Sequence, residues 1–462
     1  MHLGVRLSGT GTTGQQLSAL LSSQRAMSSS SSASRRVFIA GGATTTFLGK
    51  GHPEFIHPKH PEFGKKENPD LKYYLSTPVA ETLQATGLAG KDVDRLYVGN
   101  FAGELFSKQG HLGSALAGVS PDFLYKPSMR IEGACASGGL AVAAAADVLR
   151  AGKENGGADV VLVVGAEVQS TVSAREGGGF LARAADFPRQ ADIDDFAFPC
   201  LLARRTKAYL EKHPHLSMDD LNAVVAKAYA NGNRNPKAHM HRSKVPLEAA
   251  KAGEKNPNFL SNQDFCGHVR MRDCSQVSDG GSCIVMANEN GLKGIGKGAD
   301  LVELVASEYG CGNLYEDPKD LAEMDTCKAV VDRLYARTGC DISKVDVAEV
   351  HDCFSIAEIL MYEAIGLAAP GEGPKCAQSG VTSLEGTLPV NTGGGLIAFG
   401  HPVGATGVKQ IHEIYRQMKG QCGEYQLPKK PQVGLAVNMG GDDKTIVATL
   451  LKNVVETPSA NL

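Results

Sequence analysis

The sequence predicts an α/β protein made of two similar halves with an inserted segment between them. Short, apolar, β-branched strands alternate with helical stretches along the chain, which is the pattern of sheets covered by helices. The elements of the first half recur in the same order in the second half, and a polar segment separates the two. We divide the 462 residues into a targeting or disordered leader (1–35), a first half (36–172 and 265–297), an inserted loop domain (173–264), a second half (298–455) and a tail (456–462).

Each element of the first half and of the insertion follows from local spacing. An apolar run that ends in two glycines predicts a buried strand at residues 37–42. Helical apolar spacing and strong helix formers predict the helices, and β-branched runs predict the other strands. The predicted order is strand 37–42, helix 73–86, strand 93–100, helix 138–150, strand 160–167, helix 198–212 in the insertion, and a turn with a strand at 278–286.

The second half repeats this order. A helix is predicted at 326–338, a strand at 345–350, a helix within 400–420 and a strand at 433–437. The strand at 345–350, with the residues just before it, matches 90–98. The helix within 400–420 matches the helix at 138–150, and the strand at 433–437 matches the strand at 160–164. Two such halves are expected to meet across a pseudo-twofold axis, which brings the ends of equivalent strands and helices into one cleft.

The composition bears on partners and metals. A net charge of −3 gives no global attraction to nucleic acid or to an anionic membrane. No apolar run reaches the roughly 20 residues of a membrane span. The 11 cysteines lack the paired spacing of metal ligands, so we expect reduced thiols and no metal.

The N-terminal residues have the composition of a targeting segment. Residues 1–35 contain no Asp or Glu, but they carry Arg6, Arg25 and a serine run at 28–32. Acid-poor leaders rich in Arg and Ser are typical of mitochondrial presequences, and we expect a mitochondrial location. A disordered tail is the alternative for this segment. Residues 460–462 resemble a peroxisomal address only distantly, so a peroxisome or similar organelle ranks second.

Cys135 stands just before the Ala-rich helix and is the candidate nucleophile. Free N–H groups and the positive end of a helix dipole favour the thiolate form of a cysteine. We therefore expect the Cys135 thiol to ionise more easily than usual. The alternative is a small buried residue at a close-packed turn.

Three further motifs combine reactive side chains with glycines. His351 and Cys353 follow the strand at 345–350, where α/β proteins place their sites, and they could donate hydrogen bonds and carry protons. His401 lies among glycines, just before a predicted helix start at Pro402. The turn after the strand at 433–437 contains Gly440, whose free N–H could stabilise an oxyanion. The alternative for His351 and Cys353 is a structural strand terminus without a chemical role. The alternative for His401 is a buried histidine that only packs.

The four motifs together resemble the active-site blocks of the thiolase superfamily. They are C-A-S-G-G at 135–139, H-D-C-F at 351–354, G-H-P-V-G-A-T-G at 400–407 and N-M-G-G at 438–441. The H-D-C-F block resembles that of the sterol-carrier-protein-type thiolases, since most thiolases have N-E-A-F there. Most also have an acid/base cysteine where this chain has Asn438. In the sterol-carrier-protein type, the cysteine of H-D-C-F is understood to take over that role.

The resemblance implies both a fold and a reaction. The fold is the thiolase fold, with two βαβαβαββ halves in five αβαβα layers. The reaction is that of a 3-ketoacyl-CoA thiolase (acetyl-CoA C-acyltransferase) in fatty-acid metabolism. Cys135 would attack the keto carbon after losing its proton to His401, and Cys353 would protonate the leaving enolate. His401 and a water held by His351 would form one oxyanion site, and the N–H groups of Cys135 and Gly440 the other.

The resemblance also implies ligands and partners. CoA is a substrate, with no permanently bound cofactor and no metal, and the protein is expected to be a homodimer or a higher homo-oligomer. The basic stretch 231–244 of the insertion is either a solvated loop or a phosphate-binding segment. In the second case, Arg234, Lys237, Arg242 or Lys244 would hold the CoA phosphates.

Two other functions remain open at this point. A β-ketoacyl-synthase-like condensing enzyme would use Cys135, His351 and His401 and would have no need of Cys353. A non-catalytic, thiolase-like acyl-CoA-binding protein would keep the fold without turnover.

Overall fold

The computed structural model describes residues 35–295 and 300–454. The predicted leader, apart from Arg35, and the predicted tail lie outside these residues. Every strand that the sequence predicts is present, and β3, β6 and β9 are additional. The strands are β1 Val37–Thr44, β2 Arg95–Gly99, β3 Ser128–Ile131, β4 Val160–Glu167, β5 Gly280–Asn288, β6 Val302–Cys311, β7 Val347–Glu349, β8 Val433–Gly440 and β9 Thr445–Asn453.

The predicted helices also form, as α2, α5, α8, α12 and α15. Local signals set their ends: Asp70 caps the start of α2 by accepting the N–H of Tyr73, and Gly87 ends it in the left-handed conformation, with φ 68°. The α-helices are α2 Leu71–Thr86, α3 Gly103–Phe106, α4 Leu112–Ala117, α5 Ser137–Ala151, α6 Ala174–Leu181, α7 Phe187–Gln190, α8 Ala197–Lys212, α9 Asn222–Gly232, α10 Leu247–Ala250, α11 Glu289–Leu292, α12 Asp325–Thr338, α13 Ser355–Ala364, α14 Gly373–Gln378 and α15 Thr406–Lys419.

The strand order confirms the internal repeat. The nine strands follow the order β3-β2-β4-β5-β1-β6-β9-β8-β7. Read outward from the middle, β1-β5-β4-β2-β3 of the first half matches β6-β9-β8-β7 of the second. The parallel and antiparallel pairings agree as well. At the position equivalent to β3, the second half has a single parallel bridge between Ala348 and Val390.

The two halves join where β1 pairs with β6 in antiparallel fashion, as Val37 with Leu304 and Ile39 with Val302. Each of these strands has a register irregularity next to the junction, between Ile39 and Gly41 in β1 and between Leu304 and Ala306 in β6. Such irregularities bend a strand and increase its twist. The equivalent strands β1 and β6 therefore both bend next to the junction of the two halves.

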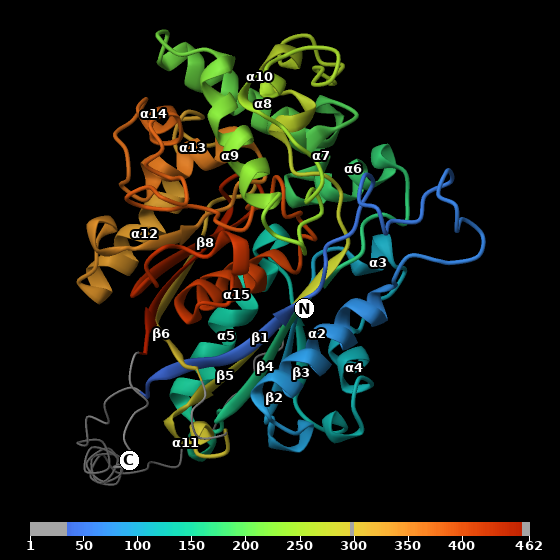
Figure 1. Cartoon of the computed structure of the whole chain (residues 1–462), viewed down its shortest axis with the longest axis vertical. Helices are drawn as coiled ribbons and strands as arrows, with labels where there is room; N and C mark the ends of the chain where they lie inside the picture. The colour runs from blue at the N-terminus through green and yellow to red at the C-terminus, as the bar shows by residue number, and fades with distance from the viewer. Residues whose placement is uncertain (1–34, 296–299, 455–462) are drawn as a thin grey trace, which may run out of the picture. The chain divides into compact units, whose positions relative to one another are not determined.

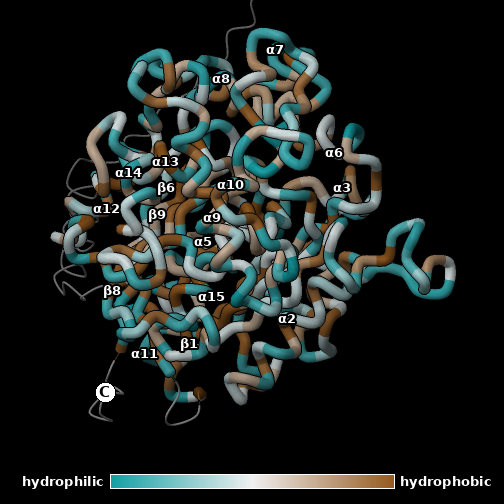
Figure 2. The backbone as a smooth tube through the Cα atoms, turned by 45° about the horizontal axis from the view of Figure 1, so that its top comes forward, coloured by the Kyte–Doolittle hydropathy of each residue, from teal (hydrophilic) through white to brown (hydrophobic). Residues whose placement is uncertain are grey.

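Helices α5 and α15 lie side by side in the middle of the fold (Figure 1), and each contacts strands of both halves. On the outer faces, α2 covers β1 and β5, α4 covers β2 and β3, and α12 covers β6 and β9. This gives the expected layers of helix, sheet, helix, sheet and helix. Apolar segments gather in the interior, and most hydrophilic ones form the outer loops (Figure 2).

The insertion shares its apolar core with the second half. Leu201 of α8 and Val224 of α9 belong to the same buried cluster as Ile356 and Leu360 of α13. A buried ion pair between Lys227 of α9 and Glu358 of α13 lies within this contact. Because both charges are removed from water, the pair requires close packing around it. The insertion is thus fixed to the half that carries His351 and Cys353.

Candidate active site

Cys135 lies in a tight turn between β3 and α5. It occupies a single 3-10 turn, Ala134–Ala136, directly before the first residue of α5. Ala134 has φ 52°, a left-handed conformation that costs energy for a residue with a side chain. The Glu132 carboxylate accepts the Ala134 N–H at 2.6 Å and holds this conformation. The buried thiol of Cys135 is therefore presented on a strained turn at a helix start.

The structure brings Cys135, His351 and His401 together from both halves. The Cys135 sulfur and one ring nitrogen of each histidine lie within 4.8 Å of one another. The two imidazole rings are 4.9 Å apart and nearly perpendicular, at 84°. All three residues are buried. This agrees with the expectation that equivalent ends of the two halves meet in one site.

The hydrogen bonds of His401 bear on its tautomer. Its Nδ1 lies 2.6 Å from the hydroxyl of Thr406, and that hydroxyl also lies 3.2 Å from the Pro402 carbonyl. With the hydroxyl proton directed at this carbonyl, His401 Nδ1 donates to Thr406 and Nε2 keeps a free lone pair. Burial lowers the pKa of His401 to about 3. The ring is therefore neutral in this structure.

The expected easy ionisation of Cys135 is wrong for the ligand-free protein. Burial, followed by the Glu167 carboxylate, raises the pKa of the Cys135 thiol to about 12. The backbone N–H groups of Gly441 and of Cys135 itself oppose this shift but do not overcome it. The loss of hydration disfavours the charged thiolate more than the N–H groups at the helix start favour it. Cys135 is a thiol at rest, so a base must remove its proton.

Gly440 packs directly against the turn that carries the nucleophile. A Cβ atom at this position would lie 2.1 Å from the Gly133 carbonyl oxygen, so a side chain is excluded. The N–H of Gly441, which has φ 66°, is one of the two backbone groups that lower the pKa of Cys135. The oxyanion donor predicted at Gly440 stays a prediction, and the structure adds Gly441 beside it.

Cys353 is buried close to Cys135. Burial, and next the proximity of Cys135, raises the pKa of the Cys353 thiol well above its usual value. The Cys353 carbonyl accepts the N–H of Ser275 at 2.9 Å, which ties this segment to the part of the first half that follows the insertion. A thiol that stays protonated next to the nucleophile can serve as a proton donor. The structure thus places the two predicted reactive cysteines in one site.

Sequence reasoning missed Asp352, the second residue of H-D-C-F. Its buried carboxyl accepts the N–H groups of Leu396 at 2.7 Å and Ile397 at 3.3 Å. These residues belong to the glycine-rich loop that leads to His401. Asp352 therefore links the segment of His351 to the loop of the second histidine. The sequence did offer a signal for Asp352, because it is an acidic residue two positions after the predicted buried strand at 345–350.

Glu167 was also missed. It ends the apolar strand β4 and is fully buried. Its carboxylate accepts N–H groups from Phe101 at 2.8 Å in the first half and from Gly404 at 3.1 Å in the second. Burial raises the pKa of Glu167 to about 7. This residue connects the two halves beside the Cys135 site.

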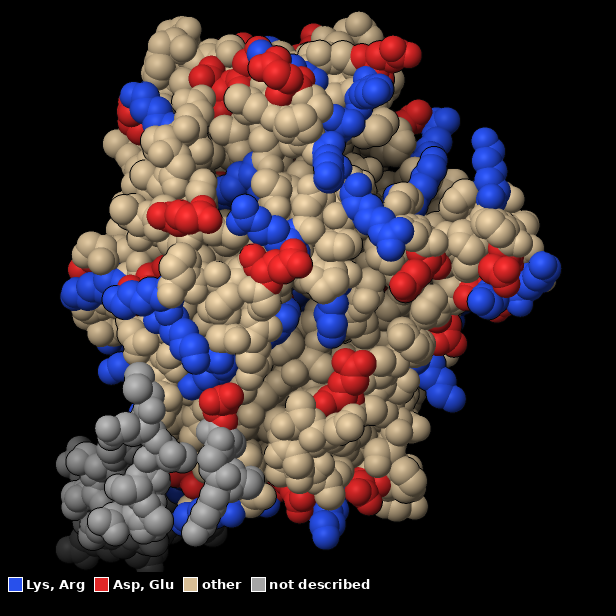
Figure 3. All heavy atoms as spheres, viewed as in Figure 1, with Lys and Arg blue, Asp and Glu red and all other residues tan. Residues whose placement is uncertain are grey.

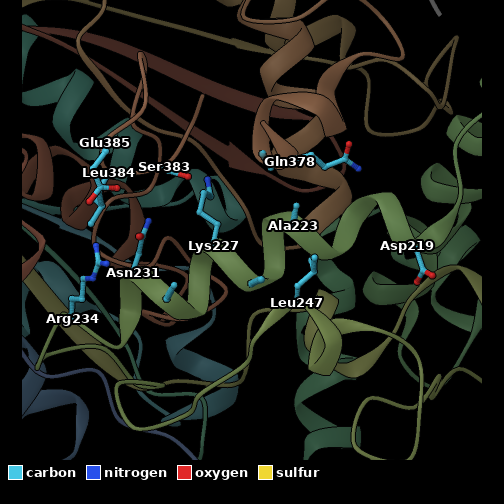
Figure 4. A pocket seen from close by; sticks show the side chains of 13 residues that line it. Asp219, Ala223, Lys227, Asn231, Arg234, Leu247, Gln378, Ser383, Leu384 and Glu385 are labelled. Atoms are coloured by element: carbon cyan, nitrogen blue, oxygen red, sulfur yellow. The ribbon is translucent and has the colours of Figure 1, made fainter. Parts of the chain in front are cut away.

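The basic residues predicted to hold CoA do not converge on one place. Lys237 donates to the Thr44 carbonyl of β1, so its ammonium already has a partner. Arg234 lines a pocket of about 600 Å³ between α9 and α14 (Figure 4), apart from the three reactive residues. Arg242 and Lys244 are exposed. Lys and Arg side chains also form a band on the face shown in Figure 3, in the region of the insertion.

Comparison with known proteins settles the family. A profile described as "Thiolase, N-terminal domain" matches residues 62–290, and one described as "Thiolase C-terminal domain-like" matches residues 312–453. An acetyl-CoA acetyltransferase of Methanocaldococcus jannaschii is 30% identical over 400 residues, which are 85% of this chain and 96% of the relative. The chain belongs to the thiolase superfamily.

Other thiolase relatives and structures agree with this assignment. Rabbit sterol carrier protein 2 is 33% identical over 221 residues, which are 47% of this chain and 40% of that protein. A structure of an Ltp2-ChsH2(DUF35) aldolase has a TM-score of 0.70 at 19% identity and covers 90% of this chain and 98% of its own. Human mitochondrial 3-ketoacyl-CoA thiolase in complex with CoA has a TM-score of 0.64 at 14% identity, covering 91% and 98%. The last two show the shared fold.

Membership in the superfamily identifies the chain as an acyltransferase. Relatives that match 83% and 85% of this chain are acetyl-CoA acetyltransferases. Within the described residues, only the helical stretch 134–151 is long and apolar enough for a membrane span, and 67% of it is buried inside the protein. This stretch is the turn of Cys135 together with the core helix α5, so no membrane span is indicated.

The high pKa of Cys135 predicts how its alkylation depends on pH. A thiol with a pKa of about 12 is protonated at lower pH, and its thiolate fraction grows about tenfold per pH unit. We expect iodoacetamide labelling of Cys135 in the ligand-free protein to accelerate in this way from about pH 6 to 9, as measured by mass spectrometry of its peptide. N-acetylcysteine, with an ordinary thiol pKa, is the control and should level off near the upper end. A plateau for Cys135 between about pH 6 and 8 would instead reveal a thiolate–imidazolium pair.

Proposed function

We propose that the protein is a 3-ketoacyl-CoA thiolase of the sterol-carrier-protein type, acting in lipid metabolism. The observation that carries this proposal is the second thiol: Cys353 is buried and close enough to Cys135 to be affected by its charge, and the Cys135 sulfur lies within 4.8 Å of a nitrogen of each histidine. An acyl transfer that also breaks a carbon–carbon bond needs a nucleophile and a separate proton donor for the departing carbanion. The two cysteines supply both.

The first half-reaction forms an acyl-enzyme. His401 Nε2 takes the proton of Cys135 as the sulfur bonds to the keto carbon of the substrate. The bond between that carbon and its neighbour on the thioester side then breaks. Its electron pair moves to the acetyl-CoA enolate, which Cys353 protonates. The shortened acyl group remains on the Cys135 sulfur.

The second half-reaction releases the product. The thiolate left on Cys353 removes the proton of an incoming CoA thiol, and the CoA sulfur attacks the acyl-Cys135 carbonyl. Collapse of that adduct frees the shortened acyl-CoA, and the proton held by His401 returns to the Cys135 sulfur. Each group has then regained its starting protonation state, and the reverse sequence is the condensation.

Two oxyanions arise along this path, and the site has donors for each. The N–H groups of Cys135 and Gly440, with Gly441 adjacent, support the alkoxide formed at the nucleophile. His401 in its protonated form, and His351 through a water, support the enolate oxygen. Removing one donor of this kind typically costs roughly a hundredfold to a thousandfold in rate.

CoA is the proposed partner as substrate and product, with no permanently bound cofactor. The human thiolase of the same fold is described in complex with CoA, which supports this choice. Of the four basic candidates, Arg242 and Lys244 remain the better ones for the CoA phosphates. They are exposed on the insertion, whereas the Lys237 ammonium is occupied by the Thr44 carbonyl. Arg234 is exposed as well, but it lines the separate pocket between α9 and α14.

The decisive variant is Cys353→Ala. We expect wild-type protein to cleave acetoacetyl-CoA or a 2-methyl-branched 3-ketoacyl-CoA in the presence of CoA. The cleavage is measured as the loss of absorbance of the enolate form of the substrate. Loss of the proton donor should lower this rate by roughly a hundredfold to ten-thousandfold. Cys340→Ala removes a half-buried thiol that lies before β7 and should leave it unchanged.

The rival functions give different results in the same assay. A condensing enzyme would show malonyl-dependent condensation that Cys353→Ala leaves intact. An acyl-CoA-binding protein would bind both substrates and cleave neither. Either outcome contradicts the thiolase proposal.

We also propose a homodimer or a higher homo-oligomer. Strand β3 is an outer strand of the sheet, and Leu124, Tyr125 and Met129 in and beside it expose large apolar surfaces. Exposed apolar residues on a sheet edge favour pairing with a second copy.

Met129→Lys should therefore weaken self-association. A lysine on an edge strand opposes pairing, and we expect the dissociation constant to rise about tenfold to a hundredfold, measured by sedimentation equilibrium. Tyr315→Lys, at an exposed apolar residue elsewhere, is the matched control. A monomeric wild-type protein at micromolar concentration would refute the proposal.

The mitochondrial location expected from residues 1–35 remains a proposal, and its support is the acid-poor, Arg- and Ser-rich composition of that segment. Fusing residues 1–35 to a fluorescent protein should direct the fusion to mitochondria in fungal or animal cells. Replacing Arg6 and Arg25 with Glu should abolish the import, because positive charge is part of the signal. Accumulation of the unmodified fusion in peroxisomes or the cytosol would count against the proposal.

A further inference from the structure

Asn438 connects the two parts of the catalytic cluster. It lies in β8 and is only 3% exposed. Its Nδ2 donates to the Cys135 carbonyl at 3.1 Å and lies 3.2 Å from His351 Nδ1. Its Oδ1 accepts the N–H of Gly139 at 3.1 Å. One buried amide thus contacts the nucleophile turn, the start of α5 and a site histidine.

The orientation of this amide follows from its backbone partners. The Gly139 N–H can only donate, so the atom facing it is the oxygen. The Cys135 carbonyl can only accept, so the atom facing it is the nitrogen. The remaining N–H of that nitrogen points at His351. Glycines also confine the amide, since a Cβ atom at Gly407 would lie 2.3 Å from the Asn438 oxygen.

We propose that Asn438 is a positioning residue that keeps the proton of His351 on Nε2. A donated N–H at Nδ1 requires a lone pair there, so a neutral ring must carry its hydrogen on the other nitrogen. His351 Nε2 is buried and has no hydrogen-bond partner among the described residues. On this assignment Nε2 is a free donor of a ring that has one nitrogen within 4.8 Å of the Cys135 sulfur and of a His401 nitrogen.

The two histidines then hold opposite tautomers. With the Thr406 hydroxyl proton on the Pro402 carbonyl, His401 has a lone pair on Nε2, whereas Asn438 leaves His351 with a proton on Nε2. One ring can accept the proton of Cys135, and the other can donate to a water or to an enolate oxygen. Burial and the neighbouring His401 also lower the pKa of His351 well below its usual value. Hydrogen bonds, and not charge, therefore determine which histidine can accept a proton and which can donate one.

The same arrangement opposes metal binding. A cysteine and two histidines within this distance are the ligand types that zinc prefers. Zinc at His351 Nε2 would require the ring proton to move to Nδ1, where it would meet the N–H of Asn438. Carboxylates behave in the opposite way, because they accept the Nδ1 proton of a metal-bound histidine and strengthen the site. Asn438 thus keeps a potential metal site in its proton-donating form.

The test is Asn438→Asp, which preserves the size of the side chain and the acceptor for Gly139 but replaces the donor with a second acceptor. We expect the His351 proton to move from Nε2 to Nδ1, as read from ¹⁵N shifts and couplings of labelled histidine. The His351 resonances are assigned by their loss in His351→Gln. Inhibition by zinc ions should strengthen roughly tenfold to a hundredfold, by analogy with changes in the partner of a metal-bound histidine. Thiolysis should slow by roughly a hundredfold or more because an oxyanion donor is lost.

Asn453→Asp is the matched control. Asn453 is a buried asparagine whose amide donates to the carbonyls of Met418 and Pro431 at 3.1 and 3.2 Å, at the far end of β9 from the turn that joins it to β8. It should change neither the His351 spectrum nor zinc inhibition. Equal effects of both variants would assign Asn438 a purely structural role and overturn the proposal.

The wild-type spectrum tests the proposal even if the variant does not fold. A proton on Nδ1 of His351 in the native protein would refute it directly. The tautomer and zinc binding to the catalytic cluster, measured by calorimetry, need no turnover, whereas the expected rate loss rests on the proposed thiolase function. Absent thiolysis with the proton on Nε2 would therefore refute the function and leave the role of Asn438 standing.

Discussion

The close crossing of α5 and α15 is the constraint on which the site depends. A Cβ atom at Gly138 would lie 2.9 Å from the Gly404 carbonyl, and one at Gly407 would lie 2.2 Å from the Gly139 nitrogen. The two helices therefore meet backbone to backbone near their starts, where side chains would hold them apart. Because Cys135 precedes one helix and His401 precedes the other, this approach brings the proposed nucleophile and the proposed base together. The C-A-S-G-G and G-H-P-V-G-A-T-G motifs are thus two sides of one contact.

The same close packing excludes water and so determines the resting charge of the site. Burial keeps Cys135 a thiol and both site histidines neutral, with a pKa of about 12 for the thiol and about 3 for His401. A preformed ion pair is absent from such a site, and charge must develop as the reaction proceeds. Fixed N–H groups and oriented imidazoles are effective under these conditions, because they need no reorganisation when the charge appears.

The sequence predicts the scaffold and the reactive residues better than their electrostatics. The helices and strands of both halves, their repeat, and the residues Cys135, His351, Cys353 and His401 follow from periodicity and motif. The direction of the Cys135 pKa shift does not, because a sequence shows the helix start but not the depth of burial. Asp352 and Asn438 were not assigned roles for a related reason. Their importance lies in hydrogen bonds to residues distant in sequence, which no local pattern records.

The insertion is coupled to the chemistry through the turn after β8. Arg205 of α8 forms a buried ion pair with Asp442, and it also donates to the Glu323 carbonyl at 2.7 Å. Asp442 directly follows Gly441, whose N–H lowers the pKa of Cys135. Removing one partner of a buried ion pair is costly, because the other charge is left without compensation. The position of α8 and the orientation of the Gly441 N–H are therefore linked. The insertion, which is expected to bind substrate, thus also supports the proposed oxyanion site.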